Sequence, residues 1–439
     1  MIRWNERRAH PATDNPRASG PSINIALACC LLLLTVTPLE RDDVHHLTQI
    51  DLLAAMKLGI RLLAIGVFSI QLVAFNKRRP LGAALACLLP ALGYVGWATA
   101  STSWSALPAV TFGQVLGLSA LWCLAAAVFV WRQDGDERRW FLAISVSLTL
   151  FSGGLLVAFF VNGAGSDRFA FRYAHPTTAG STASLGVIIA TFAALRGWRW
   201  ANRMFIVSLA THGLILLIAW NRWSIALATT GSLACLTMYL RPQTRAALAT
   251  AGAILCIAYL TVDAGWRGAE QVAAPVVKYG ARGQTAGQLK DASGRRQLWE
   301  TMWRSYSDSP WKGHGYFVTS STGALDIWGR RTNFTAHNMF LQALVSTGLI
   351  GCALFSLAVA WTATRIGIAT WAANANGSRE LFAFYLLMGA WLLAWGILNA
   401  GLLGPLQPLS VVFAVGVGLA FGRLAWDREQ QLIALEAAQ

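Results

Sequence analysis

The stretch NMFLQALVSTGLIGCALFSLAVAWTA, residues 338–363, runs for 26 residues without a charged side chain. A helix of about 20 apolar residues crosses the hydrocarbon core of a bilayer, so this stretch predicts a membrane-spanning helix. The composition of the whole chain agrees with it. Hydrophobic residues make up 55% of the 439 residues and charged residues 13%, and the mean hydropathy is +0.49. About a quarter of the residues of an ordinary soluble domain are charged, so this composition excludes disorder and argues against a water-soluble globule.

Similar apolar runs recur from one end of the chain to the other. We place the predicted spans near residues 22–38, 58–75, 81–100, 110–131, 140–161, 177–195, 204–220, 223–240, 246–263, 338–363, 381–400 and 405–425. The fold class that they predict is an all-α polytopic integral membrane protein with about twelve transmembrane helices. The chain then divides into helices one to nine over residues 1–263, one large loop over 264–336, and helices ten to twelve over 337–439.

Basic residues gather in alternate connections, which predicts how the chain is oriented, because positively charged short loops stay in the cytoplasm. Residues 77–79 are Lys-Arg-Arg, whereas residues 99–109 contain no basic side chain. Both termini are therefore expected in the cytoplasm and the large loop in the periplasm. The apolar run 22–38 is not followed by a small-residue cleavage site, so we expect an uncleaved helix. All seven cysteines fall inside predicted spans, which implies no disulfide framework.

The net charge of +15 is compatible with nucleic acid, anionic lipid or a phosphorylated substrate as partner. The basic residues are spread over both sides of the predicted membrane and form no single stripe, so a nucleic-acid partner is excluded. The large loop nevertheless carries ten basic and five acidic residues on the side where the positive-inside rule predicts few. Contact with anionic headgroups explains such a surplus as well as an anionic ligand does.

The sequence TAHN, residues 335–338, opens the tenth predicted span and carries its most distinctive histidine. His337 and Gly348 are eleven residues apart, about three helical turns, and so share one face of a straight helix. Gly348 and Gly351 would leave a shallow slot for a neighbouring helix or for an acyl or prenyl chain. A helix N-terminus and nearby arginines lower the pKa of a histidine, so His337 is expected to be neutral and able to accept a proton. The alternative is that His337 only caps the helix.

Two arginines lie where a cation is costly or unusual. Arg222 occupies the tight connection between the seventh and eighth predicted spans, at membrane depth or just outside it. Arg172 and His175 lie just before the sixth span, on the same outer side. No Asp or Glu falls in the interior of any predicted span, so a substrate phosphate is the expected partner, since Arg binds phosphate oxygens through paired hydrogen bonds.

Two segments of the large loop add further candidates. SGRRQLW, residues 293–299, opens an amphipathic helical pattern with Arg295 and Arg296 in its first turn, typical of a helix at a membrane interface. PWKGHGY, residues 310–316, contains His314 between two glycines. A turn of this kind exposes backbone N–H groups, which serve the structure or approach an anionic group.

Other ionisable residues have simpler interpretations. His212 lies inside the seventh predicted span and is expected to be a core histidine. Asp42, Asp43, His45 and His46 in the first outer loop suggest a metal, yet they match no recognisable ligand framework.

Taken together, these residues resemble the O-antigen ligase and polymerase superfamily of bacterial envelope glycosyltransferases. The resemblance covers the architecture of the whole chain and, at residue level, 221–222, 293–315 and 337–351. The ligase signature of His-Asn, nine residues, then Gly-two residues-Gly is met in full from His337 to Gly351. One large loop before the tenth helix looks more like the ligase than the polymerase, which tends to carry two sizeable loops.

The chain departs from the family pattern at the loop arginine. That motif normally ends in Leu four residues after the arginine, but here Arg295 is followed by Leu298 and Trp299. Whether Arg295 or Arg296 is the functional residue is therefore open.

The resemblance implies a reaction and roles for individual residues. An O-antigen polysaccharide would be transferred from undecaprenyl pyrophosphate to a sugar hydroxyl of lipid A-core, on the periplasmic side of a Gram-negative inner membrane. His337 would be the general base of an inverting transfer, and Arg222 and Arg295 would complete the catalytic set. The residues implied in substrate binding are Arg172, His175, Arg296, His314, Asn338 and Gly348. No metal or other cofactor is required.

Three alternatives stay open. An O-antigen polymerase would use the same donor but a second lipid-linked glycan as acceptor. A divalent metal held by Asp42 and Asp43 would change the mechanism but not the reaction. A twelve-helix polysaccharide or lipid transporter would share the architecture, but the sequence shows neither internal six-plus-six symmetry nor carboxylates inside its spans.

Overall fold

The structure is a computed structural model that describes residues 52–75, 81–131, 136–161, 175–219, 221–240, 243–244, 295–373, 378–403 and 406–437. These residues are almost entirely helical. The helices are α2 (Leu52–Phe75), α3 (Leu81–Ala100), η2 (Ser101–Ser103), α4 (Pro108–Trp131), α5 (Asp136–Val161), α6 (Pro176–Leu195), α7 (Arg199–Ala219), α8 (Arg222–Tyr239), α12 (Arg295–Asp308), α13 (Met339–Ala372), α14 (Ser378–Ile397), η4 (Gly401–Leu403) and α15 (Pro408–Ala437). The two described strands, β1 (Leu325–Ile327) and β2 (Arg330–Thr332), form an antiparallel hairpin that pairs Ile327 with Arg330.

Eight of the described helices are long and apolar enough to cross a membrane, namely α2 to α6 and α13 to α15. The expectation of a mostly helical, multi-pass membrane protein is therefore confirmed. Helices α7 and α8 also coincide with predicted spans, so ten of the twelve spans have a described helix. The spans predicted at 22–38 and 246–263 lie outside the described residues. The total of twelve, the three-part division and the extent of the large loop stay predictions.

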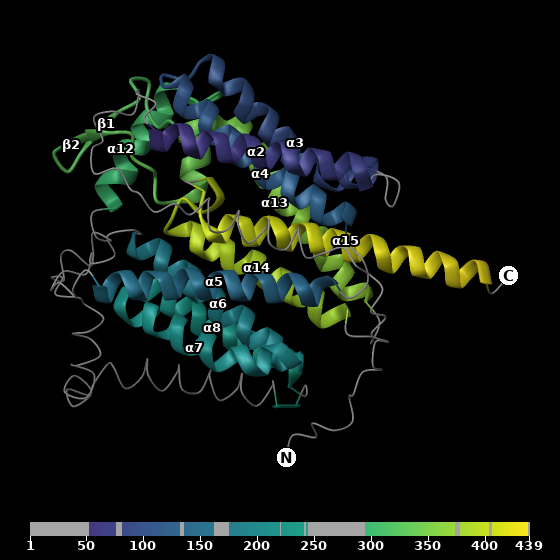
Figure 1. Cartoon of the computed structure of the whole chain (residues 1–439). Coiled ribbons are helices and arrows are strands. Elements are labelled where there is room, and N and C mark those ends of the chain that lie inside the picture. The colour runs from purple at the N-terminus through teal and green to yellow at the C-terminus, as the bar shows by residue number, and fades with distance from the viewer. Residues whose placement is uncertain are drawn as a thin grey trace.

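The helices form two groups joined by a central pair. Helices α2, α3, α4 and α13 lie on one side, α5 to α8 lie on the other, and α14 and α15 run between them (Figure 1). Helix α12 and the β1–β2 hairpin cover one end of the bundle, and α15 ends at the other (Figure 1). We call residues 295–336 the cap. The cap is held to α13 by a small apolar core made of Leu298, Met302, Ile327, Ala336 and Val345.

Small residues let α6 approach its neighbours closely, so that this helix becomes the buried centre of its group. A Cβ on Gly180 would lie 2.7 Å from the hydroxyl oxygen of Ser224 on α8. A Cβ on Gly186 would lie 2.2 Å from Nε2 of His212 on α7. His212 itself is fully buried, and its Nδ1 is hydrogen-bonded to the hydroxyl of Ser152 at 2.9 Å, as expected for a core histidine.

Helix α13 is broken at Gly348, whose backbone lies at φ 69° and ψ −172°. A break inside a membrane helix leaves backbone groups without partners, and these must be satisfied by neighbouring protein. The cap supplies hydrogen-bond partners for most of these backbone groups. Their hydrogen bonds are His314 N to Val345 O (3.1 Å), Gly315 N to Ser346 O (2.9 Å), Leu349 N to Pro310 O (2.8 Å), Ile350 N to Trp311 O (3.3 Å) and, from α3, Trp97 Nε1 to Thr347 O (2.9 Å).

This break corrects two expectations about the glycines. His337 and Gly348 do not share one face of a straight helix, because the helix begins at Met339 and is interrupted at Gly348. The slot expected beneath His337 is also occupied by the chain itself. A Cβ on Gly348 would lie 2.2 Å from the carbonyl oxygen of Trp311, and one on Gly351 would lie 2.9 Å from the ring of Trp97. Gly348 therefore receives the backbone of the cap rather than a lipid chain.

Ion pairs hold the helices together at the end opposite the cap. Arg423 of α15 contacts Glu137 of α5 at 3.6 Å and donates a hydrogen bond to Ser378 of α14 at 2.7 Å. Arg196, which follows α6, lies 3.9 Å from Glu380 of α14. These arginines are thus matched by carboxylates of neighbouring helices.

Candidate active site

His337 lies at the capped end and has an unusual backbone, with φ at +46° in the left-handed region. Such a conformation is uncommon for a residue other than glycine and persists only where the surroundings impose it. The preceding residue is fixed from two sides. The N–H of Ala336 donates to Oε1 of Gln342 at 2.8 Å, and the indole N–H of Trp299 donates to the carbonyl of Ala336 at 2.9 Å.

The residue after His337 is fixed as well. Asn338 is the N-cap of α13, and its Oδ1 accepts hydrogen bonds from the N–H groups of Phe340 (3.0 Å) and Leu341 (2.9 Å). Its Nδ2 donates to the carbonyl of Ile397 at the end of α14, at 3.1 Å. The backbone on both sides of His337 is therefore anchored to α12, α13 and α14.

Burial, followed by the charges of Arg295 and His175, lowers the pKa of His337 to about 4. The imidazole is consequently neutral at pH 7, as the sequence predicts, and has a lone pair available to accept a proton. A pKa this low also means that His337 by itself is a weak base.

Two arginines from separate helices lie together in the same region. Burial and the charge of Arg222 lower the pKa of Arg295, so these two guanidinium groups lie close enough for their charges to act on each other. Arg222 is the first residue of α8 and is exposed, whereas Arg295 is the first residue of α12 and is half-buried. A polyanion placed between them would relieve the repulsion between like charges.

His175 is the N-cap of α6 and completes the group. Its Nδ1 accepts a hydrogen bond from the N–H of Thr177 at 3.3 Å, and lies 2.7 Å from the Thr177 hydroxyl. The neutral ring therefore carries its proton on Nε2. His175, Arg222, Arg295 and His337 all stand at the N-terminal ends of their helices, where the helix dipoles add positive potential and attract anions.

The structure separates the two candidate loop arginines. Arg295 lowers the pKa of His337, whereas Arg296 is exposed and pairs with Glu300 on the next turn of α12 at 3.0 Å. Geometry thus favours Arg295 as the residue that faces the histidine. Arg172 lies outside the described residues.

The placement of His314 corrects the expectation that this side chain approaches a substrate. It is buried, and its Nε2 donates to the carbonyl of Ser305 at 2.8 Å. The Ser305 hydroxyl in turn donates to the carbonyl of Thr319 at 2.6 Å. His314 therefore ties α12 to the rest of the cap, and the glycines beside it let the loop dock against α13 and against Ser105, between η2 and α4.

Possible metal ligands are scarce in the part of the chain that the structure describes. There, no group of three or more His, Cys, Asp or Glu side chains is arranged to hold a metal ion. The acidic first loop, with Asp42, Asp43, His45 and His46, lies outside the described residues. The metal-dependent alternative for that loop stays a hypothesis.

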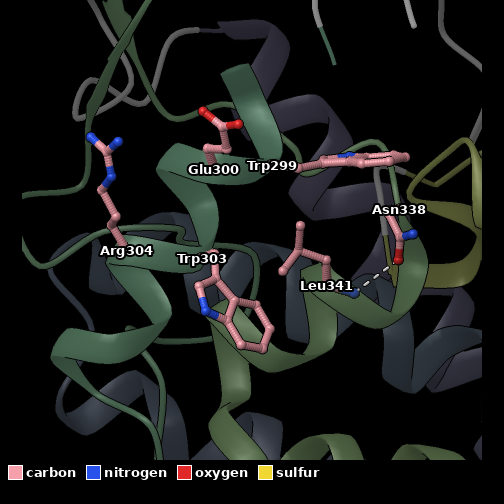
Figure 2. Close-up of a pocket in the computed structure, with 6 residues that line it drawn as sticks. All are labelled: Trp299, Glu300, Trp303, Arg304, Asn338 and Leu341. Atoms are coloured by element: carbon pink, nitrogen blue, oxygen red, sulfur yellow. Dashed lines mark hydrogen bonds between the residues drawn. The ribbon is translucent and has the colours of Figure 1, made fainter. Parts of the chain in front are cut away.

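An open pocket of about 440 Å³ lies between α12 and the N-terminus of α13 (Figure 2). Helix α12 supplies four of its lining residues, and α13 contributes Leu341 together with its N-cap. The six are Trp299, Glu300, Trp303, Arg304, Asn338 and Leu341. The sequence shows the aromatic stripe that forms this wall, but the stripe alone favours a helix resting on the membrane surface.

One intramembrane arginine escaped the sequence interpretation. Arg61 lies in α2, and its guanidinium donates to the carbonyl of Gly113 on α4. Its charge also acts on the cap residue Tyr316, whose pKa is raised by burial and lowered in part by Arg61. The signal was available, because a basic residue inside an apolar run usually has a specific partner.

Comparison with known proteins gives one result that bears on this site. Residues 173–356 match the family model described as O-antigen ligase. The matched segment contains all four converging residues, His175, Arg222, Arg295 and His337. The search of curated proteins gave no match.

Proposed function

Because residues 173–356 match the family model described as O-antigen ligase, we propose that this chain is an O-antigen ligase. It would transfer an O-antigen polysaccharide from undecaprenyl pyrophosphate to a sugar hydroxyl of lipid A-core, on the periplasmic face of a Gram-negative inner membrane. One observation carries the proposal: a neutral histidine on a fixed backbone lies near Arg295, and Arg295 in turn lies near Arg222, which comes from a different helix.

The arginines would bind the pyrophosphate of the donor. Arg222 and Arg295 each present a planar fork that matches phosphate oxygens, and both stand at helix N-termini. As the bond between the anomeric carbon and the phosphate oxygen breaks, negative charge grows on the leaving pyrophosphate. Donors already in position stabilise that charge without reorganisation. Arg172, just ahead of His175 in the sequence, stays a proposed supporting residue.

His337 would accept the proton of the acceptor hydroxyl. The hydroxyl oxygen then forms a bond to the anomeric carbon, and undecaprenyl pyrophosphate departs with the electrons of the broken bond, which inverts the configuration. Binding of the negative pyrophosphate beside His337 raises its pKa from the low value of the empty site. The histidine would thus become an effective base only when the donor is present.

The test is transfer with purified components and two acceptors offered separately. A ligase should attach the polysaccharide to lipid A-core and leave a second lipid-linked glycan unextended, whereas a polymerase should show the reverse. Activity in excess EDTA would eliminate a divalent metal. Failure to form any covalent product from an authentic donor, with correctly inserted protein, would contradict the enzymatic proposal and favour a transporter.

A further inference from the structure

The pocket between α12 and the N-terminus of α13 has the chemistry of a sugar-binding surface, and neither the sequence pattern nor the family match assigns it. Trp299 and Trp303 extend from α12 towards Asn338 and Leu341, whereas the carboxylate of Glu300 and the guanidinium of Arg304 point away from both rings (Figure 2). The pocket thus combines indole rings with charged groups at its rim. Its volume of about 440 Å³ falls within the range of small-molecule sites.

The two indoles are held differently from freely exposed side chains. The N–H of Trp299 is engaged by the carbonyl of Ala336, which fixes the plane of the ring. The ring of Trp303 packs against Tyr306 with 5.3 Å between centroids, yet 56% of Trp303 stays exposed. Rigid aromatic side chains give large contact areas at a low cost in conformational entropy.

A pyranose ring suits such a surface both through its C–H bonds and through its hydroxyl groups. Its axial C–H bonds carry partial positive charge and pack well on the negative face of an indole. Its hydroxyl groups extend sideways, and the pocket lining includes a carboxylate and a guanidinium, those of Glu300 and Arg304. A lipid chain would match the rings but not this charged rim.

The position of the pocket favours the acceptor sugar over the donor glycan. Trp299 is bonded to the residue before His337, and Asn338 is the residue after it, so the pocket adjoins the backbone of the proposed base. Among the described residues, the pocket lining includes neither Arg222 nor Arg295. An attacking hydroxyl must reach the base and approach from the side away from the pyrophosphate, which this separation allows.

We infer that Trp299 and Trp303 form the platform on which a core sugar of the acceptor stacks while its hydroxyl meets His337. The inference rests on the proposed ligase function, which supplies the acceptor. Trp303 is the residue to test, because it is exposed and can be changed without disturbing the apolar core of the cap. Trp371 serves as the matched control, since it is 86% exposed and lies at the far end of α13.

Binding can be measured without turnover by saturation-transfer NMR, using full-length protein in nanodiscs and delipidated core oligosaccharide as the probe. Wild type and Trp371→Ala should bind equally, and Trp303→Ala should bind about tenfold more weakly, in line with the loss of one aromatic contact. Trp303→Tyr should retain most of the affinity. Equal binding by Trp303→Ala, or no binding by wild type, would overturn the inference.

Two further arms separate the competing explanations. If delipidated O-antigen glycan binds through Trp303 and core oligosaccharide does not, the pocket serves the donor and the acceptor assignment is wrong. If Trp303→Leu binds as well as wild type, the tryptophan acts only as an apolar anchor in the bilayer interface, which also overturns the stacking role. Absence of transfer by wild type would refute the ligase function alone, because the NMR arms report on the sugar platform independently.

Discussion

His337 combines two properties at one residue, an imidazole that is neutral in the empty site and a backbone in the left-handed region. The first concerns chemistry and the second concerns folding, so substitutions can separate them. Asparagine tolerates positive φ better than most residues but cannot replace imidazole as a base, whereas valine fails in both respects.

We therefore expect His337→Asn to reach the membrane at normal abundance and to unfold near the wild-type temperature. Its transfer rate should fall by about 10²- to 10⁴-fold, the usual contribution of general base catalysis. His337→Val should lose stability as well. Transfer rates with purified components and thermal unfolding curves of the two variants check these expectations. Normal transfer by His337→Asn would refute the general-base role.

The pH dependence of the reaction follows from the same side chain. A base must be unprotonated to act, so the rate falls as the pH drops through the pKa of His337, which is about 4 in the empty site. Bound pyrophosphate raises that pKa. The acid limb of kcat, which reports the substrate complex, should therefore lie at higher pH than the acid limb of kcat/KM, which reports the free enzyme. Coinciding limbs would show that donor charge does not reach the histidine.

The paired arginines lead to a prediction about geometry as well as charge. Arg295→Ala should lower kcat by about 100-fold, as for removal of one donor to a developing anion, and Arg295→Lys should restore it only in part, because ammonium lacks the planar fork. Arg296→Ala should stay near the wild-type rate, since Arg296 is directed to Glu300. Steady-state kinetics with saturating acceptor distinguish the three arginine variants. A larger loss in Arg296→Ala than in Arg295→Ala would reverse the assignment.

At the scale of elements, the broken helix α13 and the docked cap determine each other. Gly348 supplies the left-handed backbone and the open space that the carbonyl of Trp311 fills. The freed groups of α13 then bond to residues 310–315. His314 holds the same loop to α12 through Ser305. The N-terminal half of α13, which follows His337, is thereby positioned by the cap.

Gly348→Ala should accordingly disrupt the site from a distance. The added Cβ would lie 2.2 Å from a backbone atom, and alanine also disfavours φ at +69°. We expect a lower unfolding temperature and reduced transfer. Gly367→Ala is the matched control, because Gly367 lies in regular α13 with open space around it, and alanine stabilises helix interiors by up to about 1 kcal/mol over glycine. Equal stability of the two variants would contradict the close approach at Gly348.

The sequence predicts some of these elements well and others poorly, for physical reasons. Long apolar runs determine membrane helices because the bilayer imposes their length, and ten of the predicted runs coincide with described helices. The break at Gly348 leaves the hydropathy of residues 338–363 unchanged, so periodicity could not reveal it. The contacts of His314 and the position of Trp303 in a pocket could not be predicted either, because both depend on which segments meet in space. Arg222 could be selected because a cation at membrane depth is costly, whereas His337 and Arg295 are indicated by their places at predicted helix starts and by the family resemblance.

Across the whole molecule, the arginines at the two ends of the bundle have different neighbours. Arginines at the end opposite the cap, such as Arg423 and Arg196, pair with carboxylates of neighbouring helices. At the capped end, Arg295 is influenced chiefly by burial and by Arg222, a second cation. The first arrangement stabilises the protein alone, and the second would, under the proposed function, receive the pyrophosphate of the donor.

If the capped end faces the periplasm, labelling in intact cells will show it. Cysteine introduced at the exposed cap residue Ser321 should react with a membrane-impermeant thiol reagent added outside the inner membrane. Cysteine at Leu435, exposed near the end of α15, should react only after the membrane is permeabilised. The parent protein without either cysteine gives the background. The reverse labelling pattern would invert the predicted orientation.

The pair Arg222 and Arg295 has a consequence for the pace of repeated turnover. Under the proposed function, the lipid carrier would keep its pyrophosphate after the sugar chain has left, with one more negative charge, so the arginines would hold the spent carrier more firmly than the loaded one. Interactions that strengthen as the bond breaks speed the chemical step but slow the departure of the product. Escape of the empty carrier into the bilayer would then set the rate, and the enzyme would slow wherever undecaprenyl pyrophosphate accumulates faster than the cell removes it.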